Sequence, residues 1–166
     1  MKQDGVPIGA DLHLHPVRPD EIERLTRLQR GAYAPWLPIL GLEPLPYRAD
    51  YRQLLEDHEA WFARTTDGTE VGALIVWTAP DHLLIWSVAV AEGHGGSGIG
   101  RALMSYAETE AVRRGRPEIR LYTHQLMARN IALYQRLGYG ETGRETTTDG
   151  RRVVHMAKRL IAGLKA

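Results

Sequence analysis

The sequence predicts an α+β protein with a mixed, mostly antiparallel central sheet of six to seven strands and helices on both faces. Apolar runs of strand length recur along the chain, and turn pairs such as Asp67-Gly68 and Pro80-Asp81 separate consecutive runs. Between these runs stand longer stretches in which apolar residues recur three and four positions apart, the period of an amphipathic helix. Because no repeat or low-complexity linker interrupts the pattern, residues 11–166 are expected to form a single domain.

The N-terminal part is expected to hold a flexible tail, a strand and a helix. The tail covers residues 1–10, and the alternation over residues 12–18 predicts the first strand. Asp20 and Glu23 have the spacing of a capping box, and the apolar residues that follow fall on one helical face. Residues 31–47 carry four prolines and are too broken for long regular structure.

The rest of the chain is expected to alternate strands and helices. Asp50 should cap a second helix that ends near Glu59, and an antiparallel meander follows, with strands over 60–65, 71–79 and 83–90. A helix over 99–114 leads to a strand that lies parallel to the third strand of the meander, because a right-handed crossover joins them. The last four elements are a strand, a helix and two strands, over 118–123, 126–137, 139–146 and 153–158.

Composition excludes several classes of protein. The chain has 166 residues, of which 43% are hydrophobic and 25% charged, as is typical of soluble globular proteins. A net charge of +1 argues against a nucleic-acid surface, and the absence of cysteine excludes disulfides and thiolate metal sites. No apolar run approaches the roughly 20 residues of a membrane span, and the N-terminus lacks a signal-peptide core. A cytoplasmic protein without nucleic-acid, membrane or metal partners is therefore expected.

The segment EGHGGSGIGRAL, residues 92–103, places four glycines in the six positions from Gly95 to Gly100. A strand is predicted before it and a helix after it, so backbone N–H groups and the positive helix end would surround an anion there. The alternative is a tight turn with glycines for packing. A dinucleotide site lacks its acidic residue about 20 positions further on. A nucleotide phosphate loop lacks its Lys-Ser/Thr pair, because Arg101-Ala102 stands there.

Two longer stretches resemble one family. SVAVAEGHGGSGIGRALMSYAE, residues 87–108, resembles the acyl-CoA-binding segment of the Gcn5-related N-acetyltransferase (GNAT) superfamily, which is a strand, a glycine loop and a helix. LYTHQLMARNIALYQRLGY, residues 121–139, resembles the next strand and helix of that family. VVHMAKRL, residues 153–160, resembles its last strand. The resemblance implies the GNAT fold and acetyl-CoA as co-substrate.

The resemblance also implies where the coenzyme binds. Its pyrophosphate would lie on the amides of the glycine loop, contributed by Gly95, Gly96, Ser97, Gly98, Ile99, Gly100 and Arg101. Its pantetheine arm would pair with the preceding strand at Val88, Ala89 and Val90, where backbone amides polarise the thioester carbonyl. The family's leading Arg or Gln falls on Gly95 here, so one phosphate-facing side chain is missing.

Two residues of the helix over 126–137 are implicated in the chemistry. The resemblance implies that Tyr134 lies near the coenzyme sulfur and protonates the leaving thiolate; the alternative is an ordinary core tyrosine. A free tyrosine titrates near ~10 and a thiol near ~8.5, so full transfer is uphill by about 2 kcal/mol, and a hydrogen bond to the thiolate is the main role expected. Asn130, on the same helical face, is expected either to contact the coenzyme or to bond to nearby backbone.

The acceptor side is less defined. Tyr33, Trp36 and Tyr47 are expected to line the acceptor pocket, as the corresponding segment does in the family. The place of the carboxylate base of some members is taken by Trp86 and Ser87. His124, at a strand end near the coenzyme entrance, is one candidate base and pocket residue, and His82 is another. A water chain or an amine of low pKa would make a base unnecessary, so no base is assigned.

These features together predict an acyltransferase. The expected reaction moves an acetyl group from acetyl-CoA to a primary amine of a small molecule or peptide, by direct attack in a ternary complex. The alternative is a non-catalytic acyl-CoA-binding module that acts as a sensor or sequesters the coenzyme, which the missing base and Gly95 keep open. The identity of the amine, the acyl chain length and the oligomeric state, a homodimer included, are left open.

Overall fold

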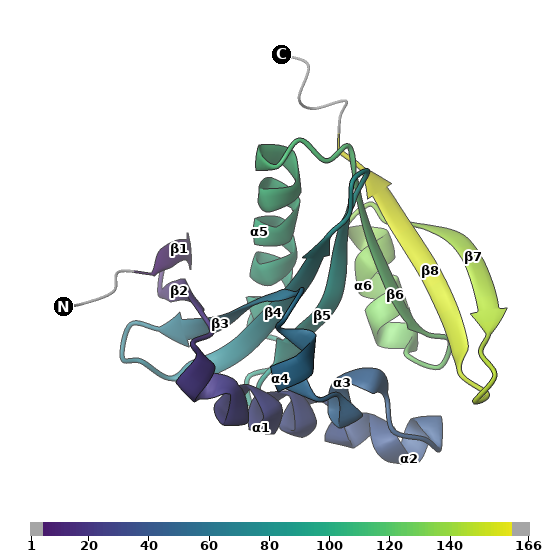
Figure 1. Cartoon of the computed structure of the whole chain (residues 1–166), viewed down its shortest axis with the longest axis horizontal. Coiled ribbons are helices and arrows are strands. Elements are labelled where there is room, and N and C mark those ends of the chain that lie inside the picture. The colour runs from purple at the N-terminus through teal and green to yellow at the C-terminus, as the bar shows by residue number, and fades with distance from the viewer. Residues whose placement is uncertain (1–4, 161–166) are drawn as a thin grey trace.

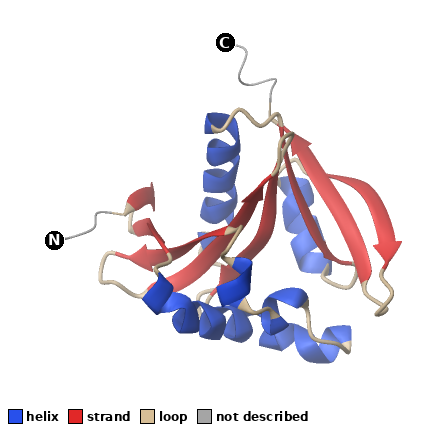
Figure 2. Ribbon diagram, viewed as in Figure 1, coloured by secondary structure: helices blue, strands red, loops and turns tan. Residues whose placement is uncertain are grey.

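The computed structural model describes residues 5–160 and contains one eight-stranded sheet between two layers of helices (Figures 1 and 2). The strand order is β1-β2-β3-β4-β5-β6-β8-β7, and all neighbours are antiparallel except β5 and β6, which are parallel. The strands are β1 Val6–Gly9, β2 Leu12–Pro16, β3 Glu59–Thr65, β4 Glu70–Thr78, β5 Leu83–Val90, β6 Glu118–His124, β7 Gly140–Thr146 and β8 Arg152–Arg159. The predicted α+β class and mixed sheet are confirmed, with one strand more than the upper expectation.

The additional strand is β1, at the edge of the sheet. Val6 pairs with Leu14 and Pro7 with His13, so the prediction of a flexible tail is wrong for these residues. Most of the β1 side chains are exposed, so β1 is held in the sheet mainly by its backbone pairing with β2. An exposed strand has no alternation of apolar and polar residues, and the sequence pattern therefore does not predict it. The first four residues of the predicted tail lie outside the described residues.

The helices lie on both faces of the sheet, as predicted. Their bounds are α1 Ile22–Tyr33, α2 Leu37–Leu40, α3 Leu45–Arg48, α4 Tyr51–Leu54, α5 Ile99–Arg113 and α6 Ala128–Arg136, with 3-10 turns at Pro19–Glu21 and Ala34–Trp36. One buried cluster, which includes Leu25, Tyr51 and Phe62, fills the space between the sheet and α1 and α4. The other contains Leu103 and Ala107 of α5, and the inner face of α6 packs against it. Figure 1 shows helices on both faces of the sheet, and a buried core fills the space on each side.

The starts of two helices differ from expectation in different ways. The predicted capping box of Asp20 and Glu23 is wrong, because the chain turns one residue earlier into a 3-10 turn that begins at Pro19. Buried Glu21 accepts from the Arg18 amide at 3.0 Å in its place. Asp50 caps α4 as predicted and accepts from the Arg52 and Gln53 amides at 3.1 and 3.3 Å. That helix ends at Leu54, earlier than predicted.

Candidate active site

The site lies where β5 and β6 separate. The parallel pairing covers only three positions, from Leu83 opposite Ile119 to Ile85 opposite Leu121. Further along β5, the Ala91 amide donates to the Val71 carbonyl of β4 at 2.8 Å. Because peptide groups alternate along an antiparallel pair, the amides of Val88 and Val90 face the opposite way, into the gap toward β6. The structure therefore places these two residues on an unpaired strand edge.

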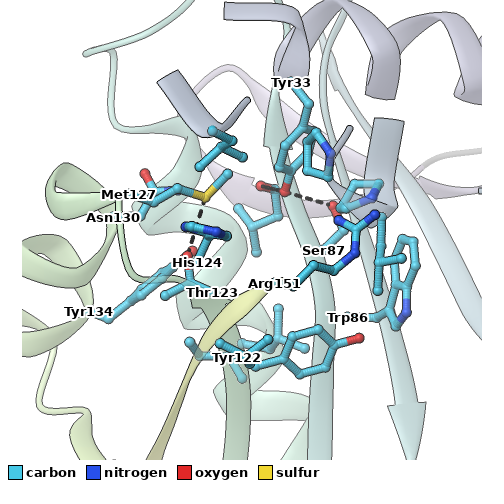
Figure 3. Close-up of a pocket in the computed structure, with 18 of the residues that line it drawn as sticks. Tyr33, Trp86, Ser87, Tyr122, Thr123, His124, Met127, Asn130, Tyr134 and Arg151 are labelled. Atoms are coloured by element: carbon cyan, nitrogen blue, oxygen red, sulfur yellow. Dashed lines mark hydrogen bonds between the residues drawn. The ribbon is translucent and has the colours of Figure 1, made fainter. Parts of the chain in front are cut away.

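Two cavities adjoin at this gap. The first, which we call the aromatic cavity, has a volume of about 730 Å³ with its open mouth included. It is lined by residues of the α1–α3 segment, β5, β6, α6 and the start of β8, among them Trp86, Ser87, Tyr122, Thr123, His124, Met127 and Arg151 (Figure 3). The second, the loop-side cavity, has about 620 Å³ and reaches Val90, Gly100 and Met104. Both cavities are lined by Tyr33, Val88, Asn130 and Tyr134, which stand at their junction.

The glycine loop presents unpaired amides at the start of α5. Gly93, Gly96 and Gly98 have φ values of 85°, 79° and 82°, which favour glycine because a Cβ is strained there. The first helical amide to be bonded is that of Ala102, which donates to the Gly98 carbonyl at 3.0 Å. Within the described chain, the amides of residues 95–101 have no hydrogen-bond partner. Orphan amides at the positive end of a helix fit a pyrophosphate, so the loop fits the coenzyme that the resemblance implied.

Gly95 differs from the other glycines of the loop. A Cβ built there meets no heavy atom within 4 Å, and its φ is not positive. The backbone therefore does not require glycine at the position where the family carries Arg or Gln. The side chain of Arg101, in the first turn of α5, is exposed beside the loop.

Tyr134 and Asn130 point from α6 to the junction of the cavities (Figure 3). Burial raises the pKa of the Tyr134 phenol, with a smaller contribution from Tyr33, so the hydroxyl stays protonated at neutral pH. Asn130 makes one weak contact, from Nδ2 to the Met127 sulfur at 3.7 Å. No side-chain bond from Asn130 to backbone is present among the described residues, so its amide remains available to a ligand.

A buried network of polar side chains joins α1 and α4 to β5. The sequence did not predict this network. Gln29 of α1 is fully buried, and its Nε2 donates to the Tyr51 hydroxyl at 3.0 Å and to the Ser87 hydroxyl at 2.9 Å. The Tyr33 hydroxyl lies 3.2 Å from the same Ser87 oxygen, and burial raises the pKa of Tyr33. A β-bulge in the β4–β5 pairing leaves Trp86 without a partner on β4, next to Ser87. The available signal was Gln29 itself, a polar residue four positions after Leu25 on the apolar helical face.

His124 lines the aromatic cavity as a neutral hydrogen-bond donor. Its Nδ1 accepts from the Leu126 amide at 3.1 Å, which leaves the proton of the neutral ring on Nε2. Burial lowers the pKa of His124, and the nearby Arg151 and Arg152 charges lower it further. His82, the other candidate base, bonds to Asp81 at 2.7 Å and lines neither cavity.

Two predicted pocket residues lie elsewhere. Trp36, in the 3-10 turn Ala34–Trp36, lines the loop-side cavity together with Val90 and does not line the aromatic cavity. Tyr47 of α3 lines neither cavity, since its ring packs 5.5 Å from the Arg30 guanidinium. The aromatic wall is instead made by Trp86, Tyr122 and Tyr134, together with the predicted Tyr33.

Within residues 5–160 there is no group of three or more His, Asp or Glu side chains that could hold a metal ion. No helix of this described region is long and apolar enough to cross a membrane.

Comparison with known proteins identifies the family. The sequence profile of the acetyltransferase (GNAT) family matches residues 22–139. Three solved structures share the fold. The ribosomal-protein-S18-alanine N-acetyltransferase from Escherichia coli is 21% identical, with a TM-score of 0.72 over 90% of this chain and 94% of that one. PaiA N-acetyltransferase from Thermoplasma acidophilum, solved in complex with coenzyme A, is 18% identical, with a TM-score of 0.71 over 89% and 98%. Spermidine/spermine N-acetyltransferase SpeG from Vibrio cholerae is 16% identical, with a TM-score of 0.69 over 95% and 98%. Since the family profile spans well over half of the 166 residues, the chain belongs to the GNAT family of acetyltransferases.

Proposed function

We propose that this protein transfers an acetyl group from acetyl-CoA to a primary amine by direct attack within a ternary complex. The observation that carries the proposal is the junction of two cavities at an unpaired strand edge. The loop-side cavity adjoins the start of α5 and suits the coenzyme, while the aromatic cavity suits the acceptor. Val88 and Tyr134 line both, so a thioester and an amine bound on either side would meet between them.

The coenzyme half of the proposal depends on unpaired backbone amides. Those of residues 95–101 are free to bind the pyrophosphate, and Arg101 adds a positive charge beside them. The amides of Val88 and Val90 face the gap and would extend the sheet to the pantetheine arm. The same edge would donate to the thioester oxygen as negative charge develops on it during attack, which lowers the barrier.

Tyr134 is proposed to stabilise the leaving thiolate. Because burial raises its pKa, the phenol holds its proton more tightly than free tyrosine, and full transfer to sulfur becomes less favourable. A hydrogen bond from the phenol to the forming thiolate needs no such transfer. The structure of the site therefore favours Tyr134 as a donor.

Among the described residues that line the aromatic cavity, none is arranged as a general base for the amine. The lining contains no Asp or Glu, and the proton of neutral His124 occupies Nε2 while Nδ1 is bonded to the Leu126 amide. The acceptor is accordingly proposed to enter as the free amine or to lose its proton through water. The excess proton after attack would leave by the same route.

A non-catalytic acyl-CoA-binding module remains the second candidate, favoured by the lack of a lining carboxylate and by Gly95 in the family's Arg or Gln position. Calorimetric titration with acetyl-CoA, with NAD as control, tests the binding half that both candidates share. Thiol release on a panel of amines then separates them. We expect saturable acetyl-CoA binding, no NAD binding and turnover of at least one amine; binding without any turnover would favour the module.

A further inference from the structure

We infer that the acceptor of this enzyme is an amino acid, whose carboxylate is bound by Arg151 while its amine faces the thioester. The inference rests on the proposed function, because it names the substrate class of the same site. It follows from the charges of the aromatic cavity, from the way Arg151 is held, and from the apolar character of the remaining wall.

Among the residues of the described range 5–160, those that line the aromatic cavity include a cation and no anion. Arg151 lines it with a side chain that is only 11% exposed, and no carboxylate is among the lining residues. The nearest partner is Asp149, which is 53% exposed on the adjacent turn and accepts from Arg151 Nε at 2.8 Å. The two Nη groups make no hydrogen bond within the described part of the chain, so the donor fork of the guanidinium is open on the cavity side. Figure 3 draws this side chain among the lining residues, between His124 and Trp86.

Arg151 is held in place by its hairpin. Its amide donates to the Thr147 hydroxyl at 3.0 Å, and its carbonyl accepts from the Thr147 amide at 2.8 Å. Gly150, with φ of 86°, lies in the turn just before Arg151. Strand β8 begins at the next residue and pairs with β6, which places Arg151 at the end of that pairing. Arg151 is buried, and Asp149 pairs only with its Nε, so two Nη groups without partners are costly to bury unless a further acceptor binds them. The planar fork of the guanidinium matches a carboxylate.

His124 adds a second donor to the same cavity. With Nδ1 bonded to the Leu126 amide, the neutral ring carries its proton on Nε2, which has no partner among the described residues. A cavity with an arginine and a neutral imidazole N–H suits an anionic group and disfavours an acceptor that carries a second positive charge. Most of the remaining wall is apolar, with Leu40, Leu42, Leu45 and Val153 beside the aromatic rings, so the amino acid should have an apolar side chain.

The test compares amino acids with their amides, which keep the amine and side chain and lack the carboxylate. Leucine, methionine, phenylalanine and tryptophan, the matching amides and dipeptides, and spermidine are assayed for thiol release with the full chain. We expect kcat/KM for the best amino acid to exceed that of its amide by about 10- to 100-fold, the range for a hydrogen-bonded charge pair. Dipeptides test whether a carboxylate one residue further away is accepted.

Arg151→Gln should remove this preference. It should lower kcat/KM for the amino acid by about 10- to 100-fold, mainly through KM, and leave the amide within a few-fold. Arg151→Lys should restore part of the loss. The matched control is Arg144→Gln, which makes the same charge change on the exposed strand of that hairpin, and it should change neither substrate.

Calorimetry separates failure of the inference from failure of the proposed function. If the wild-type protein binds no acetyl-CoA or turns over none of these amines, both the carboxylate assignment and the acetyltransferase proposal are wrong. If acetyl-CoA binds but amides or spermidine are used as well as the amino acids, the carboxylate assignment is wrong and the acetyltransferase proposal stands. The assignment also fails if Arg151→Gln impairs acid and amide equally, or if acetyl-CoA binds and only amines without a carboxylate are acetylated.

Discussion

Gln29 and Ser87 join helix α1 to strand β5 through a bond of 2.9 Å between Nε2 and the serine hydroxyl. The residues are 58 positions apart in the chain, and both are buried. Ser87 precedes Val88, whose amide faces the gap between β5 and β6. The bond therefore ties the residue next to this strand edge to helix α1.

We expect Gln29→Ala to lower the free energy of unfolding by about 2–4 kcal/mol, because it leaves a cavity and takes donors from two buried hydroxyls. Gln29→Leu should cost less, since it fills the space and also removes Gln29 Oε1, a buried atom without a partner in the described chain. Urea denaturation measures both changes. Equal losses for the two variants would show that side-chain volume contributes little at this position.

Tyr134→Phe should lower turnover by about 10- to 1,000-fold while acetyl-CoA binding persists, because in the proposed mechanism the phenol donates to the thiolate that forms during reaction. Tyr139→Phe is the matched control. Its ring packs 6.2 Å from that of Tyr134, but its hydroxyl donates to Glu108 at 3.1 Å and it lines neither cavity. Unchanged turnover in Tyr134→Phe would remove Tyr134 from the mechanism.

Gly95→Arg should strengthen acetyl-CoA binding by about 3- to 30-fold, because it supplies the missing phosphate contact at a position with room for a side chain. The gain should shrink as salt is raised from 50 to about 500 mM, as exposed charge pairs are screened. Calorimetry at the two salt concentrations measures it, with Gly95→Ala as the uncharged control. An affinity no better than that of the alanine variant would mean that residue 95 does not face the coenzyme.

Gly98→Ala should weaken acetyl-CoA binding about tenfold and cost stability of roughly 1–2 kcal/mol, because φ at Gly98 is 82° and a Cβ is strained there. Gly95→Ala, without that strain, should bind like the wild type. Thermal unfolding and calorimetry on the pair distinguish the need for a left-handed backbone from mere loop flexibility. Equal behaviour of the two variants would argue that the loop conformation is not preformed.

Stability should fall as pH drops through about 6.5, the ordinary pKa of histidine. Burial lowers the pKa of His124 in the folded state, so the unfolded chain binds more protons there and unfolding becomes easier in acid. His124→Gln should reduce the difference in unfolding free energy between pH 7.5 and pH 5. His15, whose pKa burial also lowers, remains in both proteins and cancels in the comparison. A variant with the same pH dependence as the wild type would contradict the assignment.

Much of the fold could be predicted from short-range pattern. The segments that form β3, β4, β5 and β6 are apolar runs of strand length, which predict strands. The segments of α5 and α6 have apolar residues at helical spacing, which predicts helices. Errors fall at β1, where pairing alone holds an exposed strand, at the start of α1, where Glu21 and not Asp20 supplies the cap contact, and at the end of α4. The first two depend on contacts that residue type leaves undecided.

The sequence by itself determined the class of fold, the glycine loop with its following helix, and Tyr134 as a candidate for the chemistry. Each of these depends on residues that are close together in the chain. Only the tertiary structure decided the acceptor side. It brought Arg151 of the last hairpin, Ser87 of β5 and His124 of β6 around one cavity, while Tyr47 was turned away onto Arg30. The physical reason is that these residues meet through sheet register and through the separation of β5 from β6, which long-range packing sets and local spacing does not encode.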